Sequence, residues 1–94
     1  MKSYPKKTPF RSRKYRKFIE NNECIICTRT PSAAHHEPLG WGSMGGKAPD
    51  SHCLPLCAKH HRQRHDQGAE TFWDGYDPKI LVIQYLTKYL ELYD

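Results

Sequence analysis

The stretch AKHHRQRHDQG, residues 58–68, decides the fold that we expect for this chain. Before Gly68 it contains neither glycine nor proline, and Gly68 stands where a glycine commonly ends a helix. On a helix, His61 and His65 face the same way because they are four positions apart, whereas His60 is rotated by about 100° from His61. The stretch therefore predicts a helix that offers two imidazoles to one ion and directs a third elsewhere.

Two short strands are expected immediately before this helix. The first lies around residues 33–37 and the second at about residues 52–56. A glycine-rich loop, residues 40–50, joins them. Adjacent residues on a strand point to opposite sides, so one of His35 and His36 can hold an ion while the other is free for chemistry or merely exposed.

Cysteine and histidine pairs at short spacing predict a structural metal site. Cys24 and Cys27 form a C-x2-C pair. Cys57 and His60 follow as a C-x2-H pair after twenty-nine intervening residues. Two such pairs suit tetrahedral zinc, because two residues between ligands let the chain wrap one ion without strain. Cys53 is an alternative fourth ligand, but on an extended strand it is more simply a small buried hydrophobic residue.

Length and composition fit one small domain stabilised by metal. The 94 residues are 37% hydrophobic and include 4 cysteines and 6 histidines, so the core is modest and a stabilising cross-link is expected. Cysteines beside histidines favour metal over disulfides and hence a reducing compartment. Residues 1–18 lack the apolar stretch of a signal peptide, and no later segment is long enough to span a membrane. We therefore expect a cytoplasmic protein with no membrane partner.

The charge distribution favours a polyanionic partner. The formal net charge is +5, and the sequence pI is about 9.1. The first seventeen residues contain no acid, and their basic residues are Lys2, Lys6, Lys7, Arg11, Arg13, Lys14, Arg16 and Lys17. Such an arm would add salt-sensitive affinity for nucleic acid without sequence preference. A solubilising tail is the alternative that charge alone leaves open.

The chain divides into a basic N-terminal arm with a short helix, residues 1–20, a metal-binding core, residues 21–70, and a covering segment, residues 71–94. Residues 11–20 lack glycine and proline, which favours a short helix. Residues 79–93 carry apolar residues at helical spacing, with Pro78 just before them. This last helix would cover the core or a dimer partner, and Phe72 and Trp73 are expected in the core.

Three motifs together resemble the HNH endonuclease superfamily. They are Cys24-x2-Cys27, Ala34-His35-His36 and Leu56-Cys57-x2-His60-His61-x3-His65. The likeness covers about residues 24–68, the span on which such nucleases build their site. The glycine-rich loop with Pro55-Leu56-Cys57 and His60-His61 resembles phage recombination-enhancement (Ref-like) nucleases and their small prophage relatives. The resemblance implies an α+β fold, a ββα-metal (HNH, His-Me finger) domain with zinc knuckles and flanking helices, and metal-dependent cleavage of DNA.

The resemblance also implies roles for individual residues. The ligands of the catalytic ion correspond to His35, His61 and His65. The structural zinc knuckles of many HNH members correspond to Cys24, Cys27, Cys57 and His60. His36 corresponds to the general base that activates water. His52 stands nine residues before His61, where the superfamily typically has an asparagine that braces the loop over the site. A histidine there can still hydrogen-bond the backbone, or it can serve as a further ligand.

Three neutral imidazoles would leave a divalent ion its full charge and open positions, as phosphodiester hydrolysis requires. Imidazoles suit several metals, so Mn, Ni, Co or Zn all fit this site, and Mg is the least expected. The nucleic-acid contacts that we expect are Arg62, Arg64, Lys47, Arg13, Lys14, Arg16 and Lys17. Arg62 and Arg64 flank the ligands and would face solvent or phosphate. Trp41 could stack on a base or cap the core.

Two other readings compete with the nuclease. One is a zinc-binding, nucleic-acid-binding module without catalysis, in which every cysteine and histidine serves folding. The other is an interaction adaptor built on the last helix, which leaves the histidines unused. Eight ligand-type residues at two-site spacing exceed what one zinc needs, and His36 has no structural role that the sequence reveals. These two points favour the nuclease.

Overall fold

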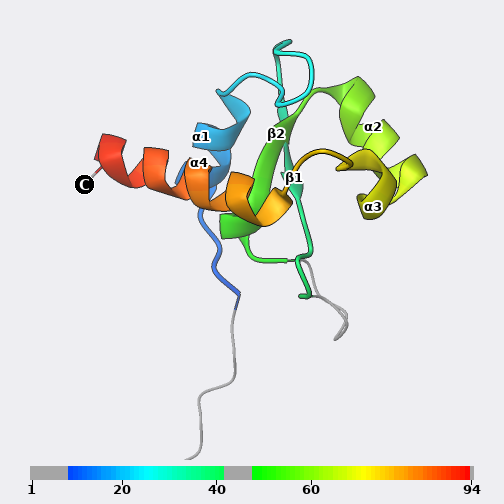
Figure 1. The fold of residues 1–94 in the computed structure, drawn as a ribbon. Coiled ribbons are helices and arrows are strands. Elements are labelled where there is room, and N and C mark those ends of the chain that lie inside the picture. The colour runs from blue at the N-terminus through cyan, green and yellow to red at the C-terminus, as the bar shows by residue number, and fades with distance from the viewer. Residues whose placement is uncertain (1–8, 42–47, 94) are drawn as a thin grey trace, which may run out of the picture.

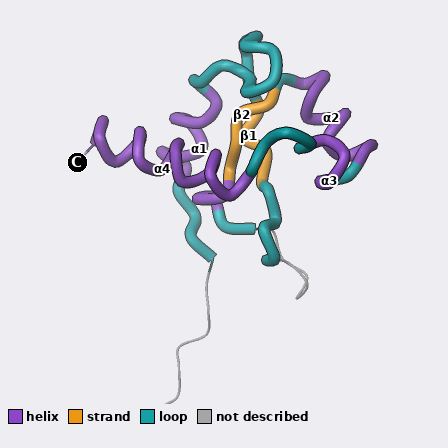
Figure 2. The backbone as a smooth tube through the Cα atoms, viewed as in Figure 1, coloured by secondary structure: helices purple, strands orange, loops and turns teal. Residues whose placement is uncertain are grey.

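The structure is a computed structural model that describes residues 9–41 and 48–93. Its elements are α1 (Arg13–Glu20), β1 (Ala33–His36), the short 3-10 helix η1 (Asp50–His52), β2 (Cys53–Leu56), α2 (Ala58–Gln67), α3 (Ala69–Phe72) and α4 (Pro78–Tyr93). Figure 1 shows the two strands between α1 on one side and α2 and α3 on the other, while α4 begins beside the strands and runs past α1. The expected α+β class is confirmed, and Figure 2 shows how small the sheet is beside the helices.

The two strands form an antiparallel pair whose register places the histidines. His35 lies opposite Leu54, and His36 lies opposite Cys53. Directly opposed residues of an antiparallel pair share a face of the sheet, and successive residues alternate between faces. The register therefore separates His35 from His36. All four residues of β2 are buried, so both faces of this small sheet are covered.

Alternation along β2 also divides the core into two clusters. One cluster contains Leu54 and Leu56 with Cys24, Cys57, Phe72, Trp73 and Val82. The other contains Cys53 with Tyr15, Phe18 and Ile19. Tyr85 and Leu86 of α4 contact both clusters. The burial of Cys53 agrees with its interpretation as a small hydrophobic residue, and the expected core positions of Phe72 and Trp73 are confirmed.

Helix α1 begins where a side-chain cap meets a buried carboxylate. The Ser12 hydroxyl oxygen accepts a hydrogen bond from the Tyr15 amide at 3.0 Å, which is the usual N-cap interaction. The Ser12 amide donates to Asp50 Oδ2 at 2.8 Å. The Asp50 amide in turn donates to the Phe10 carbonyl at 2.8 Å. These two bonds join the segment that leads into α1 to Asp50, which lies 38 residues after Ser12 in the sequence.

The observed bounds follow the expected ones closely. Helix α2 covers Ala58–Gln67, and Gly68 ends it with a φ of 85°. The first strand ends at His36, one residue earlier than expected. His52 belongs to η1 because its amide donates to the Pro49 carbonyl, which curls the chain before β2. Pro78 is the first residue of α4, a position where proline fits because the first amides of a helix have no partner in the helix.

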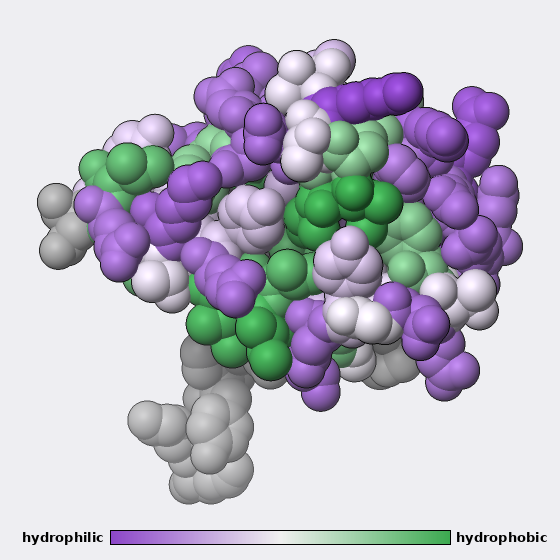
Figure 3. Space-filling view, turned by 45° about the horizontal axis from the view of Figure 1, so that its top comes forward, coloured by the Kyte–Doolittle hydropathy of each residue, from purple (hydrophilic) through white to green (hydrophobic). Residues whose placement is uncertain are grey.

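Helix α4 covers the core with one face and exposes the other. Val82 is buried, whereas Ile80, Ile83 and Leu90 are each more than half exposed. On the face drawn in Figure 3, apolar residues surface in patches between hydrophilic side chains. Among the described residues, no helix has both the length and the apolar character that crossing a bilayer requires.

Replacing Leu54 by alanine tests the core that positions β2. Leu54 is fully buried, so Leu54→Ala should lower the free energy of unfolding by about 2–5 kcal/mol. The control is Ile83→Ala, because Ile83 is 60% exposed and its truncation should change stability by no more than about 0.5 kcal/mol. Urea unfolding of the two variants measures both values. Equal losses would show that the core is misassigned.

Candidate metal centres

The cysteine knuckle and the start of α2 bring four ligand-type side chains together. We call Cys24, Cys27, Cys57 and His60 the thiolate cluster, and their ligand atoms all lie within 4.8 Å of one another. The Thr28 amide donates to the Cys24 carbonyl at 2.9 Å, which closes the turn that carries the first pair. The structure thus brings together the four residues expected from the spacing, and Cys53 lies elsewhere, in the core beside α1.

The distances in the thiolate cluster suit a tetrahedral ion. The Sγ atoms of Cys27 and Cys57 are 3.7 Å apart, and His60 Nδ1 lies 3.3 Å from Cys57 Sγ. Zinc bonds of about 2.3 Å to sulfur and about 2.0 Å to nitrogen give tetrahedral edges of about 3.8 and 3.5 Å. Burial raises the pKa of the Cys57 thiol, but hydrogen bonds from the backbone and ring of His60 outweigh it and bring the pKa down to about 6. The cluster could therefore hold a metal ion.

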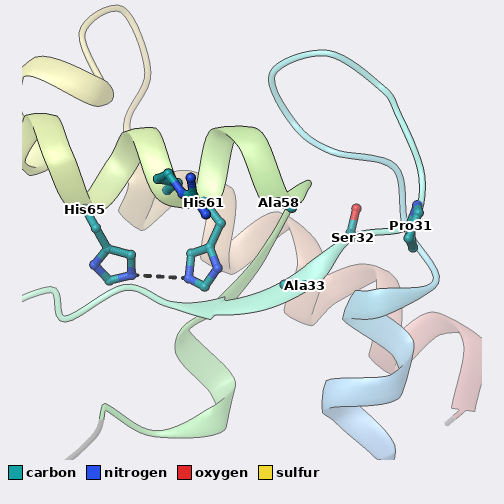
Figure 4. A pocket seen from close by; sticks show the side chains of 7 residues that line it. Pro31, Ser32, Ala33, Ala58, His61 and His65 are labelled. Carbon is teal, nitrogen blue, oxygen red and sulfur yellow. Dashed lines mark hydrogen bonds between the residues drawn. The ribbon is translucent and has the colours of Figure 1, made fainter.

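A second group of ligands lies between β1 and α2. We call His35, His61 and His65 the imidazole cluster, and their ligand atoms also lie within 4.8 Å of one another. Figure 4 shows His61 and His65 projecting from α2 toward β1, with their Nε2 atoms 3.2 Å apart. His35 is buried, His61 is half-buried and His65 is exposed. The spacing of four residues thus places both α2 imidazoles beside the strand, as expected.

The surroundings of the imidazole cluster favour neutral rings, which could bind a metal ion. Burial lowers the pKa of His61, and the neighbouring His35 and His65 lower it further. The ring is therefore held in the neutral form that can donate a lone pair to a metal. His35 donates from Nε2 to the Glu37 carboxylate at 2.8 Å, which leaves its other nitrogen for an ion. A carboxylate behind a ligating histidine is a common feature of metal sites.

Glu37 is a residue of the candidate site that the sequence did not reveal. Its carboxylate is almost fully buried and accepts hydrogen bonds from His35, from Nε and Nη2 of Arg64 and from the Trp73 indole. Burial raises the pKa of Glu37, but these hydrogen bonds and the Arg64 charge lower it more, to about 2. Glu37 therefore carries a buried negative charge that joins β1, α2 and the residue after α3.

The expected phosphate contact by Arg64 is wrong. Its Nε donates to Glu37 Oε1 at 3.0 Å and its Nη2 to Oε2 at 2.9 Å, and the residue is buried. The physical reason is helical geometry, because Arg64 follows His60 by four residues and shares its inward face. A guanidinium in that position needs a carboxylate, and Glu37 provides one.

His36 lies on the opposite side of β1 and is bound by an acid that the sequence also did not reveal. His36 Nε2 donates to Asp50 Oδ1 at 2.8 Å. Asp50 is almost fully buried. His36 still lines the same cavity as the imidazole cluster. The ring therefore has one nitrogen engaged by Asp50 while it faces the cavity in which the cluster lies.

His52 holds the turn before β2 against the end of β1. Its Nδ1 donates to the Glu37 carbonyl at 3.1 Å, and the Glu37 amide donates to the His52 carbonyl at 3.2 Å. These bonds agree with the expected bracing of the backbone. In the part of the chain that the structure describes, His52 belongs to none of the ligand groups, so the alternative of a further metal ligand has no support.

Two open cavities flank the imidazole cluster and share Ala33, His61 and His65. One has a volume of about 510 Å³, and its other lining residues are Pro31, Ser32, Ala58 and Arg62. The other has a volume of about 520 Å³, and its other lining residues are Arg16, Glu20, Ala34, His35 and His36. Figure 4 shows the first cavity beside α2 and the start of β1. The cluster is therefore reachable from solvent on both sides.

Arg62 and the basic residues of α1, which are also expected to touch nucleic acid, are exposed. Arg62 lies at the rim of the first cavity. Those of α1 are Arg13, Lys14, Arg16 and Lys17. Some have internal contacts, because Arg16 Nε donates to Asp50 Oδ2 at 3.1 Å and Lys14 Nζ lies 4.3 Å from the centre of the Tyr93 ring. Lys47 lies outside the described residues, and Trp41 is half-buried.

Comparisons with known proteins show the family. Residues 1–90 match the family described as "Protein of unknown function (DUF968)". The chain belongs to the DUF968 family. It is also 31% identical over 90 residues to the "Uncharacterized protein YdfU" of Escherichia coli (strain K12). The match covers 94% of this chain and 26% of that relative, so the chain spans about a quarter of the relative's length. No solved structure matches the chain.

The importance of the buried Glu37 charge can be tested by measuring the stability of the protein. Glu37→Gln should lower the free energy of unfolding by about 3–5 kcal/mol at neutral pH, because the amide cannot balance the buried Arg64 charge. The control is Glu70→Gln, since Glu70 is exposed. Urea unfolding measures the difference. A loss of stability no larger than that of the control would show that the Glu37 carboxylate does not stabilise the fold.

The stability difference between the wild type and Glu37→Gln should also depend on pH. The folded pKa of Glu37 is about 2, below its ordinary value of 4.5, so the carboxylate stabilises the protein above about pH 4.5. This stabilisation is lost as the pH falls toward 2. The difference in unfolding free energy between the wild type and Glu37→Gln should therefore shrink as the pH falls below 4.5. A difference that stays constant would contradict the assignment.

Proposed function

We propose that this chain is a metal-dependent, HNH-type endonuclease that hydrolyses phosphodiester bonds of DNA. The observation that carries the proposal is the position of His36. It is held apart from the three residues of the imidazole cluster, yet all four line one cavity. A second ligand group, the thiolate cluster, lies elsewhere. The order strand, strand, helix is that of the ββα-metal fold which the sequence motifs suggest.

The two clusters would divide structural and catalytic work. We assign zinc to the thiolate cluster, because three thiolates and one imidazole form a closed tetrahedral set. We assign a catalytic divalent ion to the imidazole cluster, where three ligands leave positions open. Mn, Ni, Co or Zn suits that set better than Mg. Such an ion, when bound, supplies Lewis-acid stabilisation of the charge on the phosphoryl oxygens.

The chain's own residues would do the rest. His36 takes the proton of the attacking water, and a positioned base of this kind contributes about 10²–10⁴-fold to a rate. Glu37 orients His35 toward the ion by accepting its Nε2 hydrogen. His52 ties the turn before β2 to β1. These hydrogen bonds hold His35 and the turn before β2 in place.

The exposed basic residues support DNA as the substrate. Arg62 lies beside the imidazole cluster, Arg16 lines the second cavity, and the basic residues of α1 are exposed. Contacts of this kind fix the position of a phosphate backbone without reading its sequence. A reducing compartment such as the cytoplasm is the location that we propose, since the four cysteines form no disulfide in the described part of the chain.

One observation favours the rival reading of a zinc-binding module without catalysis. The hydrogen bond from His36 to Asp50 gives His36 a structural contact. If folding were its only role, the imidazole cluster would bind metal without supporting cleavage. The two readings differ in what the loss of His36 does to cutting.

Metal content tests the two clusters. The wild type should keep one zinc per chain through dialysis and bind a second divalent ion at the imidazole cluster. Cys27→Ala should lose the retained zinc, and the matched control Cys53→Ala should keep it, because Cys53 lies outside the thiolate cluster. Elemental analysis after dialysis measures the content. If Cys53→Ala lost the zinc and Cys27→Ala kept it, the assigned set of ligands would be wrong.

Loss of His36 tests catalysis. His36→Ala should reduce the rate of plasmid nicking by at least about 10²-fold while both metals remain bound. His61→Ala is the comparison, because it should lose cutting together with the second ion. Cleavage of plasmid and oligonucleotide DNA with Mn, Ni, Co, Zn or Mg measures the rates. Wild-type nicking by His36→Ala under the same metal would refute the general-base assignment.

A further inference from the structure

Asp50 occupies a place in the site that the proposed function does not explain. One carboxylate oxygen, Oδ1, accepts hydrogen bonds from His36 Nε2 at 2.8 Å and from Arg11 Nη1 at 3.4 Å. The other, Oδ2, accepts from the Ser12 amide at 2.8 Å and from Arg16 Nε at 3.1 Å. The Asp50 side chain is 3% exposed. A buried acid is thus fixed from one side by α1 and holds His36 from the other.

The donors around Asp50 keep it in the ionised state. Burial raises the pKa of Asp50, but the hydrogen bonds from His36 and from the Ser12 amide outweigh it, and the pKa lies below its usual value. An ionised carboxylate can only accept hydrogen bonds. The hydrogen in the bond between His36 and Asp50 must therefore come from His36 Nε2.

This requirement fixes where the proton sits on the ring. A neutral imidazole carries one hydrogen, so a hydrogen on Nε2 leaves the lone pair on Nδ1. His36 lines the cavity of the imidazole cluster, and its Nε2 is occupied by Asp50. Nδ1 is then the atom that can take a proton from water, while the water oxygen bonds to phosphorus and the bond to the leaving oxygen breaks.

We propose that Asp50 is the positioning residue for His36, which it holds in the tautomer with hydrogen on Nε2 and a free lone pair on Nδ1. This inference rests on the proposed function for its catalytic part. It makes the start of α1 part of the catalytic unit, because the N-cap residue Ser12 and Arg16 of the helix fix the carboxylate that fixes the base.

The substitution Asp50→Asn tests the proposal with almost no change of shape. Its amide oxygen can keep the hydrogen bonds from Ser12 and Arg16, which places the NH2 group opposite His36 Nε2. That nitrogen must then accept, so the ring hydrogen moves to Nδ1 and the lone pair needed for catalysis is lost. The control is Asp74→Asn, the same chemical change at an exposed position.

Two measurements are made on the zinc-loaded protein and its variants. Imidazole ¹⁵N NMR gives the tautomer of His36, with His36→Gln used to assign its signals. Cleavage kinetics give kcat and KM separately. We expect hydrogen on Nε2 in the wild type and on Nδ1 in Asp50→Asn. We also expect kcat of Asp50→Asn to fall by about 10²–10⁴-fold, with KM and the affinity for the second ion within about twofold of the control.

The outcomes separate this inference from the proposed function. Hydrogen on Nδ1 in the wild type would overturn the inference, and that measurement does not use Asp50→Asn, so it decides even if that variant does not fold. A switched tautomer with an unchanged kcat would also overturn it. A wild type that cuts no DNA with any metal would overturn the proposed function. Wild-type cutting with an unaffected Asp50→Asn would overturn the inference alone.

Discussion

The buried ion pair between Glu37 and Arg64 is the interaction on which the rest of the structure depends. The Glu37 carboxylate joins three parts of the chain, because it also accepts hydrogen bonds from His35 and from the Trp73 indole. Its backbone adds two further bonds to His52. A charge removed from water in this way is tolerated only when its partners are complete. The position of α2 relative to β1, and hence the imidazole cluster, follows from satisfying that one carboxylate.

The alternation of side chains along β1 gives the adjacent residues His35 and His36 different surroundings. His35 shares the face of Leu54, and its ring belongs to the group that includes His61 and His65. His36 shares the face of Cys53 and meets Asp50. Each histidine is thus backed by its own carboxylate, and each carboxylate is held by arginine. Under the proposed function, this arrangement places the ligand His35 and the base His36 on opposite faces of one short strand.

The sequence predicted what depends on local spacing. Helix α2, its end at Gly68, the two pairs of the thiolate cluster and the pair His61 and His65 follow from intervals of two to four residues. The meeting of these pairs with one another and with His35 was expected from zinc chemistry and from the family resemblance. Arg64 and Trp73 lie 27 and 36 residues from Glu37 in the chain, and Asp50 is 34 residues from Arg16. No local pattern pairs residues at such distances. Arg64 could have been placed correctly, because it follows His60 by four residues on a helix whose His60 face must turn inward.

The three ligands of the imidazole cluster are graded in exposure, from buried His35 through half-buried His61 to exposed His65. An ion arriving from solution would meet the two helical nitrogens first and reach the strand nitrogen last. Loading and release of such an ion would then need no opening of the fold. The thiolate cluster differs, because its ligands join two segments that are separated by twenty-nine residues of chain. The occupant of the graded site would follow the metal supply of the surroundings, since three imidazoles accept several first-row ions.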